Sequence, residues 1–291
     1  MEIPFQYYPF QAAGDRSAAL PMTFAHANGY PPECYTPLLS LLSRTSPVYA
    51  VHLRPLWPGE QPSKLSEWRV LSADLLNFLD QRACRQVIGV GHSVGAIATL
   101  RAALLQPQRF AALVLIEPVL MPPWLVLLWQ IFSLFNMADR IHPLVKSARR
   151  RRQVFANRDE IFKGYRRKSI FRYLKDENLR AYTDALVADL PDGRCQLRFS
   201  TDWEAQIYAT GVKADMDLWF GLRKLKMPLL IIRGAETDTT WASTARLARL
   251  IRPATEVVTL QQSTHLVPLE KPEATVEIIE RFLSAKDKRF V

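Results

Sequence analysis

The stretch Val90-Gly91-His92-Ser93-Val94-Gly95-Ala96 decides the fold, because it places the pattern G-x-S-x-G between two elements of different kinds. An apolar run over residues 87–91 leads into it, as expected of a buried strand, and a run rich in Ala and Leu over residues 93–105 follows, as expected of a buried helix. On a tight strand-to-helix turn the hydroxyl of Ser93 is exposed, and the flanking glycines leave room for the crowded backbone. The stretch therefore predicts an α/β domain that carries a nucleophilic serine.

The same alternation of apolar runs and helical patterns extends to both sides of this stretch. Further strands are predicted at residues 21–26, 48–53, 113–117, 228–233 and 255–260, and further helices at residues 33–43, 65–81, 241–251 and 272–284. Continuous apolar strands separated by helices indicate a parallel sheet that is covered on both faces. Between them, residues 120–218 show one helical pattern after another and no convincing buried strand. We therefore expect a core domain of residues 1–119 and 219–291, interrupted by a helical cap of residues 120–218.

Composition and charge separate these two parts. The chain has 291 residues, of which 48% are hydrophobic and 23% charged, so it is neither disordered nor a collagen-like repeat. Its formal net charge is +10, and residues 146–180 alone hold 13 basic and four acidic side chains. The basicity is therefore a property of the insertion, while the rest of the chain is nearly neutral.

A nucleophilic serine needs a base, and the chain has five histidines. His265 is the best candidate, because it follows the last predicted strand and open α/β sheets place their ligands beyond the carboxyl ends of the strands. His92 is expected to pack beside Ser93, while His52 and His142 have structural interpretations.

The third catalytic residue is a carboxylate that holds the imidazole in the correct tautomer. Asp238 is the favoured candidate, because it lies just beyond the strand at 228–233 and gives the chain order Ser, Asp, His. Glu236 is a close neighbour, and Glu117, at the end of an earlier strand, is a rival. For the oxyanion we expect two backbone N–H donors, those of Val94 and Asn28, the latter in the turn-prone Asn-Gly pair.

Several segments resemble the α/β-hydrolase superfamily. They are His26-Ala27-Asn28-Gly29-Tyr30-Pro31, Gly91-His92-Ser93-Val94-Gly95, the segment 233–238, and His265-Leu266-Val267-Pro268-Leu269-Glu270-Lys271-Pro272. The resemblance implies an α/β-hydrolase fold with a mostly parallel sheet of about eight strands, flanked by helices and carrying a helical cap before the last two strands. It departs from the family at Ala27, where many members carry Gly, and at residues 53–59, which replace a common loop of the pocket.

These residues and the resemblance predict a serine hydrolase that cleaves carboxylic esters with an apolar acyl group through an acyl-enzyme, without cofactor or metal. Acyl thioesters and C–C bonds stay open as substrates, because the same three residues serve both. The alternative of another class is a ligand- or membrane-binding protein that keeps the fold without turnover.

The insertion has its own expected roles. Residues 122–132 are apolar on nearly all faces, which suits a cap over the serine, and the basic segment suits a solvated face, an anionic substrate or weak contact with an anionic membrane surface. No motif for nucleic-acid binding accompanies the basic run. Three cysteines without paired spacing and no recognisable signal peptide favour a cytoplasmic protein.

Overall fold

A seven-stranded sheet forms the centre of the molecule in the computed structural model, which describes residues 2–10, 19–134, 142–212 and 215–286. The strands follow the order β1 (Phe5–Tyr8), β3 (Val48–Val51), β2 (Met22–Ala25), β4 (Val87–His92), β5 (Phe110–Ile116), β9 (Leu229–Gly234) and β10 (Thr255–Leu260). Strand β1 pairs antiparallel with β3, and the other neighbours are parallel. The predicted α/β-hydrolase fold is confirmed, with seven described strands against about eight expected.

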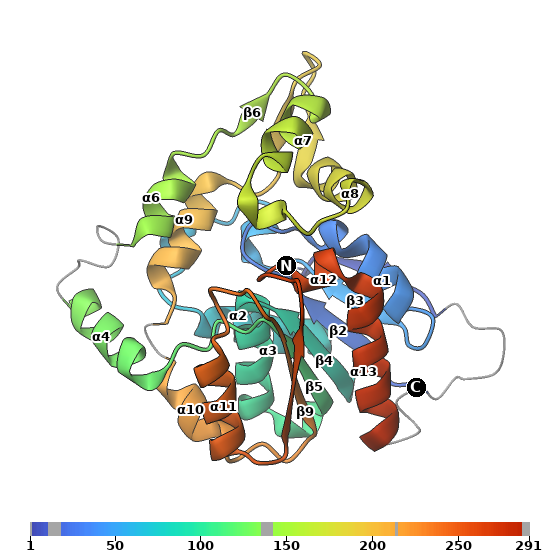
Figure 1. The fold of residues 1–291 in the computed structure, drawn as a ribbon, viewed down its shortest axis with the longest axis vertical. Coiled ribbons are helices and arrows are strands. Elements are labelled where there is room, and N and C mark those ends of the chain that lie inside the picture. Colours follow the sequence, from blue (N-terminus) through green and yellow to red (C-terminus); the bar gives the residue numbers. More distant parts are fainter. Residues whose placement is uncertain (1, 11–18, 135–141, 213–214, 287–291) are drawn as a thin grey trace.

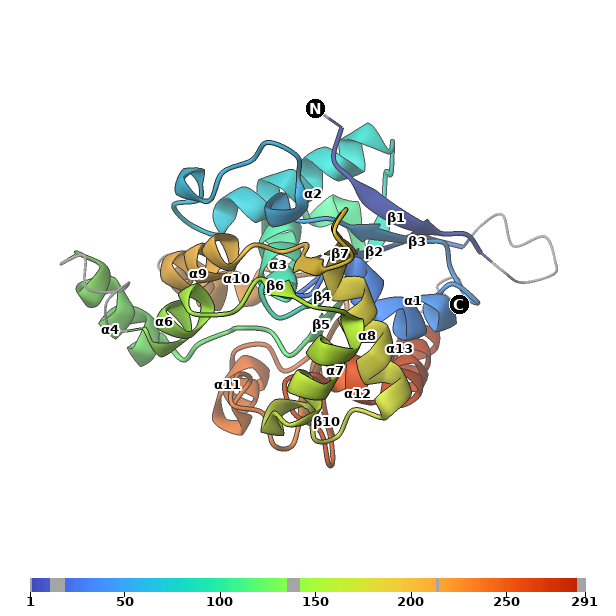
Figure 2. The same ribbon diagram turned by 90° about the horizontal axis from the view of Figure 1, so that it is seen from above.

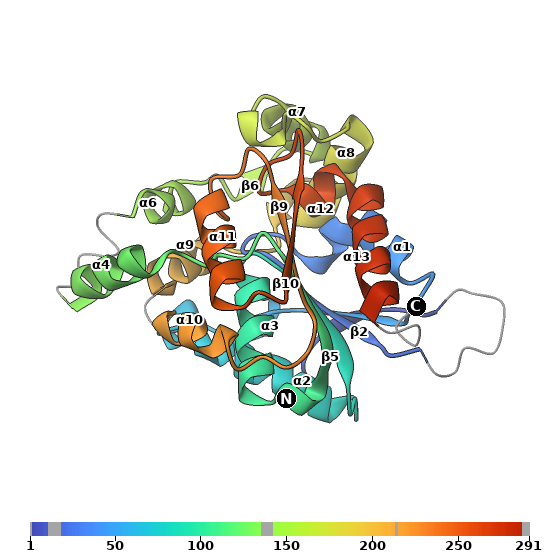
Figure 3. The same cartoon turned by 60° about the horizontal axis from the view of Figure 1, so that its bottom comes forward.

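Helices cover both faces of this sheet, as the alternation in the sequence predicts (Figures 1 and 3). One face carries α2 (Arg69–Gln81), α3 (Val94–Leu105), α10 (Met216–Leu222) and α11 (Ala242–Ile251), and the other carries α1 (Thr36–Leu42), α12 (Val267–Glu270) and α13 (Pro272–Lys286). Strand residues alternate between two buried apolar clusters, one on each face: Leu113 and Leu115 pack on one side, Val114 and Ile116 on the other. The parallel strands are therefore buried on both sides, which explains their unbroken apolar sequences.

Most of the chain between β5 and α10 forms a separate layer over the edge of the sheet where α12 begins, and the first helix of this stretch lies to one side (Figures 1 and 2). Its elements are α4 (Pro123–Leu134), α6 (Pro143–Arg149), β6 (Val154–Phe155), α7 (Arg158–Arg166), α8 (Asp176–Leu186), β7 (Val187–Asp189), β8 (Cys195–Leu197) and α9 (Thr201–Thr210). Short 3₁₀ turns lie at Pro32–Tyr35, Arg54–Leu56, Pro62–Lys64, Pro107–Arg109 and Ser169–Phe171.

This layer contains strands that the sequence did not predict. Strands β6, β8 and β7 form a small antiparallel sheet in that order. Each has only two or three residues, too few to produce a detectable alternation of apolar and polar side chains. The expected boundary at residue 218 falls inside α10, which contacts α3 and α11 of the core.

The described part of the chain contains no helix long and apolar enough to cross a membrane. Helix α4, the most apolar of the insertion, has 12 residues, whereas a span needs about 20.

Candidate active site

Ser93 occupies a strained turn between β4 and α3. Its backbone has φ +59° and ψ −121°, a region that residues with a side chain rarely adopt. A Cβ atom built on Gly95 would lie 2.2 Å from the carbonyl oxygen of Ala25, and one on Gly91 would lie 2.5 Å from that of Gly95. Both glycines of the G-x-S-x-G pattern are therefore required by close backbone approach, as the sequence predicts.

His265 lies against Ser93. Its Nε2 atom is 3.0 Å from Ser93 Oγ, although the two residues are 172 positions apart in the chain. The histidine follows β10, and the serine follows β4, so the parallel sheet brings both loops to its carboxyl edge. The pair has the geometry of a nucleophile and its general base.

The carboxylate that contacts His265 is Glu117, not the expected Asp238. Glu117 Oε2 lies 3.3 Å from His265 Nδ1, and the glutamate side chain is fully buried. Because a carboxylate only accepts, Nδ1 carries the proton and Nε2 is free to accept the Ser93 hydroxyl. Glu117, like Ser93, has a positive φ, +47°, so both residues that contact His265 lie on strained backbone.

Asp238 takes a different place. Its side chain is exposed and accepts a hydrogen bond from Thr239 Oγ1 at 3.1 Å. The loop that carries it supplies donors to Glu117 instead, since Thr237 Oγ1 lies 2.5 Å and the N–H of Thr240 lies 3.4 Å from Glu117 Oε2. The prediction that Asp238 contacts His265 is therefore wrong for this structure, because its loop turns its backbone and threonines, not its aspartate, toward the site.

The third carboxylate considered, Glu236, is exposed and binds the insertion. It accepts hydrogen bonds from Arg172 at 2.7 Å and from the Tyr173 hydroxyl at 2.6 Å. The hydrogen bonds from Tyr173 and Arg172 both lower the pKa of Glu236. Glu236 thus joins the insertion to the core.

The two expected oxyanion donors lie on neighbouring segments. Val94 is the first residue of α3, where the backbone N–H groups have no carbonyl partner within the helix. The loop that carries Asn28 touches the same turn, because Gly95 packs on the carbonyl oxygens of Ala25 and His26. The N–H of Ala27 donates to the Tyr35 hydroxyl at 3.2 Å, so the next amide in this loop, that of Asn28, is the candidate donor.

A buried hydrogen-bond chain that the sequence did not predict joins this loop to the base. His92 Nε2 lies 2.9 Å from the carbonyl oxygen of His265, so it donates, and Nδ1, 2.8 Å from the Tyr35 hydroxyl, accepts. Tyr35 in turn accepts from Ala27. The adjacency of His92 to Ser93 was visible in the sequence, but its link to the loop of His265 depends on the fold.

We expect Tyr35→Phe to lower the free energy of unfolding by about 1–3 kcal/mol, because it leaves His92 Nδ1 and the Ala27 N–H buried without their partner. Urea denaturation measures this change. Tyr8→Phe is the matched control, since the Tyr8 hydroxyl has only partly buried or exposed contacts with Gln6 and Thr36. Equal losses in the two variants would contradict the role given to the buried chain.

We also expect stability to fall as the pH drops below about 6.5. Burial lowers the pKa of His26 to about 3, and burial, with His265 nearby, lowers the pKa of His92 well below its usual value. Below this pH the two histidines are protonated in the unfolded chain but stay neutral in the folded chain. Each histidine therefore lowers the free energy of unfolding by up to about 1.4 kcal/mol per pH unit in that range. Urea denaturation between pH 7 and 5.5 should give a shallower pH dependence for His92→Gln than for the wild type, and identical slopes would contradict this account.

Among the described residues, no group of three or more His, Cys, Asp or Glu side chains is placed to hold a metal ion.

Comparison with known proteins agrees with this fold. The model of the Alpha/beta hydrolase family matches residues 24–278. A type I acyl-CoA thioesterase, mpaH, of Penicillium roqueforti is 32% identical over 137 residues, which are 40% of this chain and 31% of that protein. This chain thus spans less than a third of the length of that curated relative.

Two solved structures are similar in fold. E-2-(acetamidomethylene)succinate hydrolase has a TM-score of 0.73 at 22% identity and covers 91% of both chains. The thioesterase domain from the curacin biosynthetic pathway has a TM-score of 0.69 at 14% identity over 96% of this chain and 99% of that domain. At such identities the likeness is one of fold.

Proposed function

The chain belongs to the Alpha/beta hydrolase family, and we propose that it is a serine hydrolase that cleaves carboxylic esters through an acyl-enzyme. The observation that carries this proposal is the line of contacts from Ser93 Oγ to His265 Nε2, at 3.0 Å, and from His265 Nδ1 to Glu117 Oε2, at 3.3 Å. A hydroxyl, an imidazole and a carboxylate in this order form the arrangement that activates a serine.

In this mechanism Ser93 Oγ attacks the ester carbonyl carbon while His265 Nε2 takes the hydroxyl proton. Glu117 keeps the Nδ1 proton in place and stabilises the imidazolium that forms. The carbonyl oxygen becomes negative and receives hydrogen bonds from the N–H groups of Val94 and Asn28. His265 then returns its proton to the leaving alcohol as the tetrahedral intermediate collapses to the acyl-enzyme.

Water completes the cycle by the same route. His265 takes a proton from a water molecule, whose oxygen attacks the acyl carbon, and the acid leaves as Ser93 regains its proton from His265. The original proton of Ser93 leaves with the alcohol and a proton from water replaces it, so ester and water are the only reactants.

An apolar acyl group is supported by the surface beside the site. Helix α4 exposes Trp124, Leu127 and Ile131, by 60%, 51% and 52%. The ring of Trp124 lies 6.4 Å from that of Trp241, which directly follows Thr240, a neighbour of Glu117. We propose that residues 120–218 act as a cap that excludes water from this side of the reaction.

An acyl thioester is the second candidate substrate, favoured by the name of the Penicillium relative. The reaction at Ser93 is the same, with a thiol as the leaving group.

A panel of p-nitrophenyl esters and acyl thioesters of increasing acyl length tests the proposal in the wild type and in Ser93→Ala. We expect the wild type to hydrolyse at least one series and Ser93→Ala to hydrolyse none. A wild type without turnover on any member would instead support a binding protein with a hydrolase fold.

A further inference from the structure

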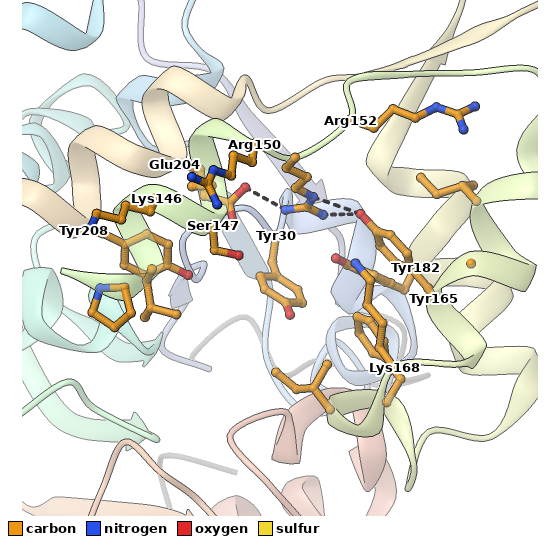
Figure 4. Close-up of a pocket in the computed structure, with 18 of the residues that line it drawn as sticks. Tyr30, Lys146, Ser147, Arg150, Arg152, Tyr165, Lys168, Tyr182, Glu204 and Tyr208 are labelled. Atoms are coloured by element: carbon orange, nitrogen blue, oxygen red, sulfur yellow. Dashed lines mark hydrogen bonds and ion pairs between the residues drawn. The ribbon is translucent and has the colours of Figure 1, made fainter. Parts of the chain in front are cut away.

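A cavity of about 780 Å³ lies within the insertion, between α6, α7, α8 and α9 (Figure 4). Its wall holds one carboxylate, that of Glu204, against five cations: Lys146, Arg150, Arg151, Arg152 and Lys168. The volume is within the range of pockets that hold small molecules, about 300–1,000 Å³. The excess of positive charge predicts an anionic occupant.

Only part of this charge is neutralised by the protein. Arg151 binds Glu204 Oε2 at 2.6 Å and also donates to the Tyr165 hydroxyl, while Arg152 pairs with Glu160 at 2.5 Å. Within the described ranges, no carboxylate oxygen lies within 4.0 Å of the three other cations, Lys146, Arg150 and Lys168. These cations are available to a ligand.

The positive charge of Lys168 is disfavoured by its surroundings, and an anion in the cavity would stabilise it. Partial burial lowers the pKa of Lys168 and the charge of Arg151 acts in the same direction, while the carboxylate of Glu204 acts against them. The ammonium lies 4.0 Å from the centre of the Tyr165 ring. A negative group in the cavity opposes both effects. An anion bound near Lys168 would therefore favour its charged form.

The cavity borders the loop of the reaction site. The carbonyl oxygen of Glu204 accepts a hydrogen bond from Asn28 Nδ2 at 3.0 Å, and the Glu204 carboxylate packs against Gly29. Tyr30, the next residue, lines the cavity and stacks on Tyr182 with ring centres 5.1 Å apart. The proposed oxyanion donor, Asn28, and the cavity-lining Tyr30 thus belong to one loop, so the cavity adjoins the segment that carries the donor.

We propose that this cavity binds the anionic part of the substrate, a group that carries phosphates or a carboxylate, while its acyl carbon lies at Ser93. The inference rests on the proposed function and narrows it to charged acyl esters or thioesters. Guanidinium and ammonium groups bind phosphate and carboxylate oxygens by charge-assisted hydrogen bonds, and the tyrosines add hydroxyl donors and ring faces. The anion belongs either to the leaving group or to the far end of the acyl chain.

Three thioesters with eight-carbon acyl chains distinguish these sources. Octanoyl coenzyme A carries phosphates on the thiol, the N-acetylcysteamine monothioester of octanedioic acid carries a carboxylate on the acyl chain, and octanoyl N-acetylcysteamine carries neither. We expect one of the anionic thioesters to exceed the uncharged one in kcat/KM by about tenfold or more, as charged hydrogen bonds predict. Wild-type preference for neither anionic substrate would overturn the proposal.

The double variant Lys146→Ala/Arg150→Ala tests whether the cavity provides this preference. Both side chains are exposed at their present positions, so the fold does not depend on them. We expect the ratio of kcat/KM between the preferred anionic thioester and the uncharged one to fall about tenfold or more. Lys163→Ala/Arg167→Ala is the matched control, since it removes two exposed cations of the same segment outside the cavity wall, and it should keep the wild-type ratio. An unchanged ratio in the cavity variant, or an equal fall in the control, would overturn the proposal.

Binding to Ser93→Ala separates this proposal from the proposed function. Calorimetric titration of that variant with the preferred anionic thioester should show binding that weakens about tenfold or more when Lys146→Ala/Arg150→Ala is added. This measurement does not depend on turnover. Residual hydrolysis by Ser93→Ala would refute only the role of Ser93 as nucleophile. Binding that is unchanged by the cavity substitutions would refute only the role of the cavity as the anion site.

Discussion

Ser93→Ala is expected to lower kcat by about 10⁴-fold or more on any ester that the wild type hydrolyses, because it removes the attacking oxygen. The fold should persist. The Ser93 side chain caps no backbone group of α3, and alanine retains the Cβ atom that the turn at φ +59° already accommodates. Initial rates and the urea midpoint of the same protein sample measure both expectations.

Ser284→Ala is the control for this substitution. Its hydroxyl is exposed and bonds only its own helix, through the carbonyl oxygen of Glu280 at 2.8 Å. We expect wild-type rates for it. Turnover by Ser93→Ala within tenfold of the wild type would exclude Ser93 as the nucleophile.

Glu117→Gln is expected to lower kcat on the order of 10⁴-fold, as the loss of the carboxylate does in other serine hydrolases. The amide of glutamine has one oxygen where Glu117 uses two, one toward the Gly234 N–H at 2.5 Å and the other toward Thr237 and His265. A glutamine that keeps its oxygen on Gly234 turns an N–H toward His265 Nδ1. The imidazole then holds its proton on Nε2, where it cannot accept the Ser93 hydroxyl.

Asp238→Asn is the matched comparison, because it makes the same change of carboxylate to amide in the neighbouring loop. Its exposed side chain contacts Thr239, so we expect kcat within about twofold of the wild type. Glu117→Asp adds a variant that keeps the charge but shortens the side chain, and its activity should lie between the other two. A large loss in Asp238→Asn beside a small one in Glu117→Gln would reassign the acid.

The difference between Glu117 and Asp238 marks the limit of prediction from this sequence. Both carboxylates follow apolar strands, and β5 and β9 are neighbours in the sheet, so either loop reaches the carboxyl edge near His265. Which carboxylate points inward depends on the path of residues 235–240, and three-dimensional contacts set that path. The chain order Ser, Asp, His favoured Asp238, whereas the carboxylate that contacts His265 is that of Glu117.

Local patterns were sufficient where an element is buried and long. The predicted strand at 87–91 corresponds to β4 and the predicted helix at 93–105 corresponds to α3, because buried apolar residues and close-packed glycines encode both directly. Strand β1 was missed because its four residues, Phe5–Tyr8, are only partly buried and too few to show a clear pattern, whereas β10, also at the edge of the sheet, has six residues.

The basic segment shows a similar limit. The sequence gives its charge but not its partners, since Arg151 pairs with Glu204, Arg158 with Asp189 and Arg172 with Glu236, all outside residues 146–180. Part of the surplus is therefore neutralised by carboxylates that are distant in the sequence. Only the fold shows which cations face the cavity.

Labelling with a fluorophosphonate tests the central claim, that Ser93 is a nucleophile activated by His265, most directly. We expect mass spectrometry of the wild type to find one phosphonyl adduct per chain, on the peptide that contains Ser93, and to find none in Ser93→Ala. An adduct of equal yield in Ser93→Ala, or one on another residue of the wild type, would contradict the claim.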